Sequence, residues 1–474
     1  MAEVPAPALD LGSGSRRIHI VGVGGAGMRA IASVLATMGH RVSGSDMKPS
    51  VGLDPLRAQG VEVHVGHAAA HITGAEVVAI STAIPATNAE VVAAHEAGIP
   101  VLRRAEVLAA LTRVRRTVSV SGTHGKTTTT TMLALVLVEA GLAPSFIIGG
   151  DVNEIGSGAV WDAGELFVVE ADESDGTFTE LVTDLAVVTN IEADHLDHYG
   201  DLAAIEAAFD DFVGAARVAV VCIDEPHAAA LAARRDSLTY GTGVGADYRI
   251  VDVAVDRVTT RFAVEHHGTR LGVIEMPIPG LHNARNATAA VAASLEVGAP
   301  FEIAVSALSR YAGVARRYQF RGTHRGVTFV DDYAHNPGKV AAVVSTAAQG
   351  GWGRVVAVFQ PHRYSRTEDL WAGFAPSFDG ADLVVVTDVD GAGEQPRPGI
   401  TGQLVADAVT SARTDQAVLY VPERAALVTL LAEELGDGDL CLTLGAGDIT
   451  VVPDEVLARL RREPGSTGSP TVHR

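Results

Sequence analysis

The chain has 474 residues, of which 47% are hydrophobic and 20% are charged, and its formal net charge is −21. This length is too great for a single hydrophobic core, so we expect several α/β domains with buried parallel strands. The acidic balance and the lack of any basic block argue against nucleic acid and anionic membranes as partners.

The two ends of the chain are rich in Pro, Gly and Ser, and we predict disordered tails at residues 1–16 and 462–474.

No apolar stretch reaches membrane-spanning length, and the first 15 residues lack the basic-then-apolar order of a signal peptide. Cys222 and Cys441 lie in apolar runs and outside any metal or redox spacing. These features predict a protein of the reducing cytoplasm.

Residues 17–114 are predicted to form a first domain with a parallel sheet. A strand leads into a glycine turn, and a helix follows over about residues 28–38. Further strand-like runs lie at 41–46, 61–66, 76–82 and 99–102.

The glycine turn after the first strand matches a nucleotide-binding pattern. Gly22, Gly24 and Gly27 satisfy GxGxxG, and Asp46 follows the second strand. The helix N-terminus can hold a pyrophosphate, and the carboxylate can meet a ribose or a base edge. An NAD-linked dehydrogenase has these parts, but so does a protein that binds any nucleoside diphosphate derivative. A tight turn without a ligand is the remaining alternative.

Residues 115–320 are predicted to form a second domain around the segment GTHGKTTTT at residues 122–130. Only three of the 36 Lys and Arg residues are lysines, and one of them, Lys126, lies in this turn. The turn joins a predicted strand at 117–122 to a predicted buried helix at 128–141. Backbone N–H groups and an ammonium there can bind phosphates, and the Thr127 hydroxyl can meet Mg²⁺.

The match to the general P-loop is incomplete, because GxxxxGK[ST] requires glycine where Val120 stands. A glycine-rich turn with an incidental lysine is therefore the alternative. A dehydrogenase does not need a second phosphate turn. Two such turns predict that the protein binds two nucleotides. One would be hydrolysed, and the other would be an unreactive part of a substrate by which the protein holds that substrate.

Acidic residues follow the predicted strand at 165–170. Glu170 ends this strand, and carboxylates at the carboxyl edge of a parallel sheet suit Mg²⁺. We expect Glu173 and Asp175, a few residues further on, to belong to a solvated acidic loop. The segment 189–201 then brings Asp and His residues, including His195, to another strand end. No ligand set has zinc-typical spacing, so magnesium–phosphate chemistry explains the segment better.

The remainder of the chain predicts an alternating, antiparallel-looking stretch at 247–278 and a helix after Asn283. Arg316 and Arg317 mark a junction to a third domain at 321–461. Its predicted strands lie at 326–332, 354–360, 382–388, 417–421 and 439–447.

Six segments in this order resemble the Mur ligases, ATP-dependent amide ligases of peptidoglycan precursor synthesis that are related to folylpolyglutamate synthetase. The segments are 122–128, 170–175, 189–201, 282–287, 315–320 and 331–337. Residues 22–28 and 360–367 are similar to the branch that adds L-alanine to UDP-N-acetylmuramate. The resemblance spans residues 17–455. It implies an α/β fold of three domains on largely parallel sheets: a Rossmann-like nucleotide-sugar domain, a P-loop ATPase domain and a C-terminal Rossmann-like domain.

The resemblance implies roles for individual residues in ATP and metal binding. Lys126, Glu170, His195 and Arg317 are the expected catalytic residues. Metal ligands would be Thr127, Glu170 and His195, for two Mg²⁺ ions or for Mn²⁺ in their place. Asp332, chosen over Asp331 because it precedes Tyr333, would hold the ribose. The expected ATP-binding residues are Gly122, Thr123, His124, Gly125, Lys126, Thr127, Thr128, Asn283, Asn286, Arg317 and Asp332.

Two further sets follow from the resemblance. Tyr333, His362 and Arg366 would bind the amino acid, with His362 and Arg366 on one face if the segment is helical. A solvated pair of surface charges is the alternative for Arg363 and Arg366. The residues expected to bind the UDP-sugar are Gly22, Gly24, Gly25, Ala26, Gly27, Met28, Asp46 and Ser81.

One position departs from part of the family. Several relatives carry a carbamoylated lysine about fourteen residues after the histidine that matches His195, and Phe209 stands there in this chain. The absence argues against the diaminopimelate-adding and D-Ala-D-Ala-adding branches.

The expected reaction is ATP-dependent activation of the lactyl carboxylate of UDP-N-acetylmuramate, followed by attack of the L-alanine amine. We expect a monomer or weak homodimer. The alternatives are a ligase that attaches murein peptide to the same sugar nucleotide during cell-wall recycling, a dehydrogenase, and a nucleotide-dependent binding switch.

Overall fold

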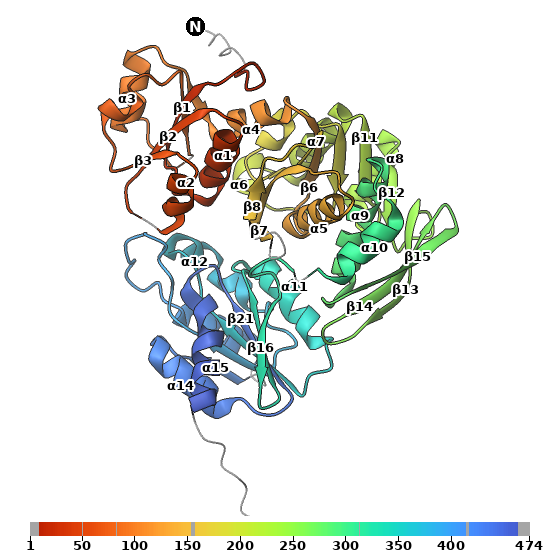
Figure 1. Ribbon diagram of the computed structural model, residues 1–474. Helices are drawn as coiled ribbons and strands as arrows, with labels where there is room; N and C mark the ends of the chain where they lie inside the picture. Colours follow the sequence, from red (N-terminus) through yellow and green to blue (C-terminus); the bar gives the residue numbers. More distant parts are fainter. Residues whose placement is uncertain are drawn as a thin grey trace, which may run out of the picture. The chain divides into compact units, whose positions relative to one another are not determined.

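The computed structural model describes residues 9–49, 51–81, 83–152, 157–311, 313–413 and 417–462. The chain separates into two compact units (Figure 1). The first comprises Met1–Ala254, Thr260–Pro277 and Leu281–Val314, and the second comprises Val255–Thr259, Ile278–Gly280 and Ala315–Arg474. The first unit holds two sheets and the second holds one.

The N-terminal sheet is parallel throughout, with the strand order β3-β2-β1-β4-β5. Because the chain moves outward from β1 to β3 and then returns to the other side of β1, the strand order reverses between β1 and β4. Ligands of open α/β sheets bind at such a reversal. The strands are β1 (Arg17–Val21), β2 (Arg41–Asp46), β3 (Glu62–Val65), β4 (Val77–Ile80) and β5 (Val101–Arg103), and the helices are α1 (Ala26–Thr37), η1 (Val51–Leu53), α2 (Asp54–Ala58), η2 (Ala69–Ile72), α3 (Ala89–Glu96) and α4 (Arg104–Thr112).

The central sheet has the order β15-β14-β13-β12-β11-β10-β6-β9-β7-β8. Its middle is parallel, so the carboxyl ends of β6, β9 and β10 lie side by side. The strands are β6 (Arg116–Ser121), β7 (Ser145–Val152), β8 (Ser157–Val160), β9 (Leu166–Glu170), β10 (Leu185–Val188), β11 (Val218–Cys222), β12 (Leu238–Gly241), β13 (Tyr248–Val255), β14 (Thr260–His266) and β15 (Thr269–Met276). The helices are α5 (Lys126–Glu139), η3 (Thr177–Glu180), α6 (Leu196–Tyr199), α7 (Leu202–Ala215), α8 (Pro226–Arg235), α9 (Leu281–Glu296) and α10 (Phe301–Ser309).

The C-terminal sheet has the order β16-β17-β21-β18-β19-β20 and is parallel except for β16. Alternate residues of β18 enter different cores: Ala357 and Phe359 pack on one face, Val356 and Val358 on the other. Burial on both faces is typical of a doubly wound sheet. The strands are β16 (Gln319–His324), β17 (Val327–Asp332), β18 (Arg354–Phe359), β19 (Leu383–Val386), β20 (Ala417–Tyr420) and β21 (Asp439–Leu444), and the helices are α11 (Pro337–Ala348), α12 (Tyr364–Leu370), η4 (Trp371–Phe374), α13 (Gln403–Ala412), α14 (Arg424–Glu434), η5 (Asp448–Val451) and α15 (Val452–Arg462).

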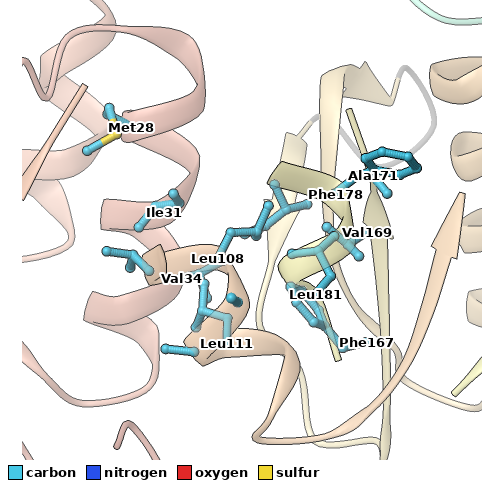
Figure 2. Packing of buried hydrophobic residues seen from close by; sticks show 14 of the residues in the cluster. Met28, Ile31, Val34, Leu108, Leu111, Phe167, Val169, Ala171, Phe178 and Leu181 are labelled. Atoms are coloured by element: carbon cyan, nitrogen blue, oxygen red, sulfur yellow. The ribbon is translucent and has the colours of Figure 1, made fainter. Parts of the chain in front are cut away.

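One hydrophobic cluster joins the first two sheets into a single unit (Figure 2). Phe178 is 1% exposed and contacts the rings of Phe209 and Phe212 at centroid distances of 5.1 Å. Burying a side chain of this kind contributes about 1.5–3 kcal/mol. Phe209, which stands where some relatives have a lysine, is therefore a core residue. Other members of the cluster come from α1, α4, β9 and the residues that directly follow β9 and η3: Met28, Ile31, Val34, Leu108, Leu111, Phe167, Val169, Ala171 and Leu181.

The fold class predicted from the sequence is confirmed: three α/β domains, each on a largely parallel sheet. Within the stretch at 247–278, β14 and β15 pair antiparallel as predicted, and β13 joins this stretch to β12, which precedes it, in parallel. The boundary predicted at 320/321 falls inside β16.

The predicted tails are only partly covered by the structure. Residues 1–8 and 463–474 lie outside the described residues. Residues 9–16, which the prediction placed in the first tail, pack on the N-terminal domain: Leu11 is buried, and the Ser15 hydroxyl donates to Gly39 O at 2.8 Å.

Candidate functional site

The first glycine turn lies at the strand-order reversal of the N-terminal sheet. Gly22 follows β1, and a Cβ added to it would lie 3.3 Å from the Cβ of Ser81, which follows β4. Asp46, at the end of β2, accepts a hydrogen bond from Gly24 N at 2.8 Å. The structure thus brings together the turn, the carboxylate and the hydroxyl that the sequence assigned to a nucleotide-sugar.

The N-terminus of α1 opens from this turn. Gly25 precedes the first helical residue, Ala26, and no side chain caps the helix. The first backbone N–H groups, including that of Gly27, therefore have no partner within the helix and can bind an anion. The Met28 side chain is 2% exposed and points into the core (Figure 2), so Met28 can offer a ligand only its backbone.

The sequence interpretation did not include Arg104, a cation beside this turn. The Arg104 Nη1 atom lies 3.0 Å from the position that a Cβ on Gly27 would take. A guanidinium at a helix N-terminus suits a pyrophosphate, because both supply hydrogen-bond donors to the same anion. Its position at the start of α4, far along the chain from the turn, gave no local signal.

The central turn is held in place by residues at the end of β10. His124 N donates to Asn190 Oδ1 at 2.8 Å, and Thr123 N donates to Asn190 O at 3.2 Å. Gly122 has φ = 134°, and a Cβ there would lie 2.1 Å from Thr189 Oγ1. Only glycine fits this position. The N–H groups of Thr123 and His124 are already bonded, so an anion would meet the N–H groups that follow, at residues 125–128.

Lys126 begins helix α5, and its ammonium is held by three oxygen atoms. Nζ donates to Gly122 O at 2.8 Å and lies 2.9 and 2.7 Å from Glu173 Oε1 and Oε2. Glu173 is 3% exposed, and burial raises the pKa of its carboxyl while Lys126 opposes that shift. The expectation that Glu173 belongs to a solvated loop is therefore wrong. The loop after β9 turns back beneath the helix start and places this carboxylate against the lysine.

Thr127 and Glu170 meet at the same edge of the sheet, as predicted for a metal site. The Thr127 hydroxyl donates to Glu170 Oε1 at 3.0 Å, and Gly149 N donates to Glu170 Oε2 at 2.8 Å. The hydroxyl and carboxylate oxygens are ligands that Mg²⁺ prefers. Asp175, by contrast, accepts hydrogen bonds from the backbone N–H and the hydroxyl of nearby Thr177.

His195 lies beside the lysine pair. It adopts a left-handed conformation at φ = 54°, and its Nε2 atom is 4.0 Å from Glu173 Oε1 and 3.7 Å from Asp194 Oδ2. Positive φ at a residue other than glycine is uncommon and is frequent at functional sites. Tyr199, in the short helix that follows, donates its hydroxyl to Glu173 O at 2.5 Å.

Helix α9 places two asparagines near the central turn. Asn286 is buried, and its Oδ1 atom lies 2.5 Å from the position of a Cβ on Gly125. Asn283, one helical turn earlier, is also buried, so both lie on the covered side of the helix. Asn286 therefore lies directly against the turn that carries Lys126.

In the second unit, the two junction arginines have different surroundings. The Arg316 guanidinium is bound to backbone carbonyls of the turn after β21, including Ala446 O and Gly447 O, each at 3.1 Å. Arg317 is exposed: its guanidinium carbon lies 5.6 Å from the centre of the Tyr333 ring, and its charge acts to lower the pKa of Asp332. Arg317 is thus the junction arginine available to a ligand.

Asp331 and Asp332 are both buried. Asp331 accepts hydrogen bonds from Thr443 and Thr450 at 2.7 Å each, which is a structural role. Asp332 accepts hydrogen bonds from Tyr318 N at 2.7 Å and from Ala334 N at 2.8 Å, and burial raises the pKa of its carboxyl. Both carboxylate oxygens of Asp332 therefore already accept a backbone hydrogen bond, and a ribose bound by Asp332 would have to share them with these N–H groups.

Four side chains gather after β17 and β18. Tyr333 and His335 rings are 5.1 Å apart, His335 and His362 are 6.0 Å apart, and Arg366 Nη1 is 3.2 Å from His362 Nδ1. His362 precedes α12, which begins at Tyr364, so the pair meets across a helix start rather than along one helical face. The prediction omitted His335, whose pKa burial lowers to about 4.

In the described part of the chain, no three His, Cys, Asp or Glu side chains are arranged to hold a metal ion. The Thr127–Glu170 pair alone offers two oxygen ligands, which fits Mg²⁺ because this ion keeps several waters and shares substrate phosphates. None of the described helices combines the length and the apolar character needed to traverse a bilayer.

Family models match three successive sections of the chain. They are described as "Mur ligase family, catalytic domain" for residues 17–116, "Mur ligase middle domain" for residues 120–294, and "Mur ligase, glutamate ligase domain" for residues 316–447.

Individual proteins match over nearly the whole chain. A UDP-N-acetylmuramate–L-alanine ligase of Acidothermus cellulolyticus is 46% identical, covering 97% of each protein. The same enzyme of Myxococcus xanthus is 44% identical, covering 97% of this chain and 98% of that protein. The crystal structure of a UDP-N-acetylmuramate–alanine ligase from Thermotoga maritima matches with a TM-score of 0.79 at 28% identity, covering 94% of this chain and 99% of that one.

Proposed function

The chain belongs to the Mur ligase family, and we propose that it joins L-alanine to the lactyl carboxylate of UDP-N-acetylmuramate at the expense of ATP. The observation that carries the proposal is the central turn, where Lys126, Thr127 and Glu170 lie at one edge of the sheet. The near-full-length relatives that carry this name support the choice of substrates. ATP and UDP-sugars are cytoplasmic metabolites, and both cysteines are free, so we propose a cytoplasmic enzyme.

The first chemical step is attack of the lactyl carboxylate on the γ-phosphorus of ATP, which forms an acyl phosphate and releases ADP. Both reactants are anions, so their repulsion must be cancelled. Lys126 supplies an ammonium to the phosphates, and Arg317 supplies a guanidinium to the transferring group. Backbone N–H groups at the start of α5 orient the triphosphate.

Mg²⁺, when bound, neutralises phosphate charge, and Thr127 and Glu170 would hold one such ion while His195 would serve a second. The chain's own contribution is to fix these ligands. Gly149 N donates to the second oxygen of Glu170 and so orients its carboxylate. Asn286 lies against the turn, and Asn283 lies one helical turn earlier on the same covered side of α9, so both amides would pair with ATP.

The second step is attack of the L-alanine amine on the acyl carbon, which expels phosphate. Arg366 and His362 would bind the amino acid's carboxylate, and Tyr333 would contact its methyl group. His335 donates from Nδ1 to Tyr333 O at 2.8 Å. Since burial lowers the pKa of His335 to about 4, the imidazole is neutral at pH 7 and its Nε2 atom is a hydrogen-bond acceptor that can orient the amine.

The UDP-sugar would be held by the N-terminal turn. Gly22, Gly24 and Gly25 shape the turn with N–H groups that are already bonded, and Ala26, Gly27 and Met28 present the free N–H groups at the start of α1 to the pyrophosphate. Asp46 and Ser81 border the turn, and Arg104 adds a cation beside it.

Replacing Glu173 with glutamine is expected to tighten binding of a non-hydrolysable ATP analogue about tenfold. The carboxylate competes with the nucleotide phosphates for the Lys126 ammonium, and a charged hydrogen bond is worth about 1.5–3 kcal/mol. Equilibrium titration with the analogue and Mg²⁺ measures the change. Asp175→Asn, in the same loop but with its carboxylate bonded to Thr177 rather than to the lysine, is the matched control and should leave affinity unaltered. Weaker binding by Glu173→Gln would contradict this account.

An acceptor comparison tests the proposed function. ADP release is followed with ATP, Mg²⁺ and UDP-N-acetylmuramate while L-alanine, glycine, L-serine or a murein tripeptide is added singly. We expect rapid ADP release with L-alanine, matched one to one by amide formation. Strong preference for the tripeptide would overturn the substrate assignment, and ADP release without any acceptor would indicate a nucleotide switch.

A further inference from the structure

A buried carboxylate in the N-terminal domain is surrounded by donors from distant parts of the chain. Glu90, in the first turn of α3, is 0% exposed. Its Oε2 atom accepts the Ser45 hydroxyl at 2.5 Å and lies 3.0 Å from His67 Nδ1, while its Oε1 atom lies 2.6 Å from His71 Nδ1. His19 Nε2 is 3.7 Å from Oε1.

These interactions outweigh the cost of burying a charge. Burial acts to raise the pKa of Glu90, but interactions with His19, Ser45 and His71 hold that pKa well below the usual carboxyl range. A charged, buried carboxylate is retained in a fold only when it is fully hydrogen-bonded, because an unpaired one is strongly destabilising. Glu90 is thus a fixed anchor within the sheet domain.

The anchor is linked to the glycine turn through Ser45. The Ser45 carbonyl accepts hydrogen bonds from Gly22 N at 2.8 Å and Val23 N at 3.0 Å. The next residue, Asp46, accepts Gly24 N at 2.8 Å. The end of β2 therefore holds the turn with its backbone, while its Ser45 side chain is held by Glu90.

The same carboxylate also fixes the segment that follows β3. Ala68 N donates to Glu90 Oε1 at 3.3 Å, beside the contacts of His67 and His71, and Gly66 N donates to Asp46 O at 2.8 Å. Glu90 consequently joins α3, the end of β2 and the loop after β3 at the carboxyl edge of the sheet. That edge is where a nucleoside diphosphate binds in such folds.

We propose that Glu90 is a positioning residue for the nucleotide-sugar, acting through Ser45 on the turn that would hold the diphosphate. This inference rests on the proposed function and adds to it a residue that contacts no substrate. It predicts that loss of the anchor weakens UDP-sugar binding without affecting ATP binding or the chemical step.

The test measures binding of UDP-N-acetylmuramate by calorimetry in the absence of ATP, together with steady-state kinetics. Glu90→Gln keeps the shape and removes the charge, and Ser45→Ala removes the link alone. We expect each to raise Kd and KM for UDP-N-acetylmuramate roughly tenfold, the size typical of losing a group that supports a ligand-binding residue. The KM for ATP and kcat should stay within about twofold. The double variant should bind no more weakly than Glu90→Gln alone, because Ser45 acts on the turn together with Glu90.

Glu96→Gln is the matched control, since it makes the same chemical change at an exposed position of α3. An unchanged Kd in folded Glu90→Gln, or equal losses in ATP KM and kcat, would overturn the inference. If Glu90→Gln does not fold, Ser45→Ala decides the question by the same criteria. Failure of the unaltered chain to bind UDP-N-acetylmuramate would instead refute the proposed function, and with it this role for Glu90.

Discussion

Replacing Lys126 with alanine is expected to lower the rate of ATP-dependent amide formation by ~10²–10³, the usual cost of removing one positioned electrostatic contact. Lys126 is the ammonium of the central turn, and its Nζ atom is held by Gly122 O and Glu173. Steady-state rates with ATP, UDP-N-acetylmuramate and L-alanine measure the loss. Lys126→Arg should not restore full activity, because a planar guanidinium does not fit a point-charge site.

The same substitution should also destabilise the protein, which calls for a second variant. Without Lys126, the Glu173 carboxylate is buried and unpaired, and breaking a buried ion pair in this way costs about 3–5 kcal/mol. Lys126→Ala combined with Glu173→Gln should recover the thermal stability but not the activity. If the double variant regained activity, the loss in the single variant would reflect folding rather than phosphate binding.

Arg310 provides a control for the loss of one positive charge, because its ion-pair partner is at the other end of α5 from Lys126. Arg310 pairs with Glu139, the last residue of α5, and is largely exposed. Arg310→Ala should leave the rate unaltered, since exposed ion pairs contribute little.

Replacing Arg317 with alanine is expected to lower kcat by at least ~10², because arginines that stabilise a transferring phosphoryl group contribute 10³ or more in related chemistry. Its guanidinium is exposed, so the folded state should lose little stability. Single-turnover ADP formation and a thermal melt measure the two quantities separately.

For the neighbouring Arg316 we expect the reverse: a loss of stability rather than a direct loss of phosphoryl-transfer rate. Arg316 binds carbonyl groups of the turn after β21 and lies 3.5 Å from Asp331, which is fully buried. Arg316→Ala should lower the free energy of unfolding by roughly 3 kcal/mol, since the carbonyl groups of the turn lose their donor and the buried Asp331 loses one of its two guanidinium partners, keeping Thr443, Thr450 and Arg321. Equal effects of the two substitutions on stability and rate would contradict the separate roles of these arginines.

Much of the central site could be predicted because its signals are local. A β-branched run, a glycine turn, Lys126 and a buried helix follow one another directly, and the structure has β6, the turn and α5 in that order. Glu170 could be placed because it ends an apolar strand, and the carboxyl ends of neighbouring parallel strands meet at one edge.

The residues that were missed depend on contacts between distant segments. Glu173 was assigned to a solvated loop because sequence does not show that the loop returns to the start of α5. Glu90 is bonded to residues from two other segments of the first domain, and no periodicity links them. Arg104 and His335 belong to the same class, since each acquires a role only when the sheet brings strand ends together.

Two strands were not predicted from the sequence, for a different reason. β12 (Leu238–Gly241) and β16 (Gln319–His324) contain polar and glycine residues that do not produce a strand pattern. Their conformation comes from pairing with β11 and β17, which is a tertiary preference rather than a local one.

The most direct test of the central claim is the fate of a carboxylate oxygen. UDP-N-acetylmuramate labelled with ¹⁸O in its lactyl carboxylate is incubated with the protein, ATP, Mg²⁺ and L-alanine, and the inorganic phosphate is analysed by mass. An acyl phosphate transfers one carboxylate oxygen to phosphorus, so we predict one ¹⁸O in each phosphate released. Phosphate without label, formed alongside the amide, would contradict the account.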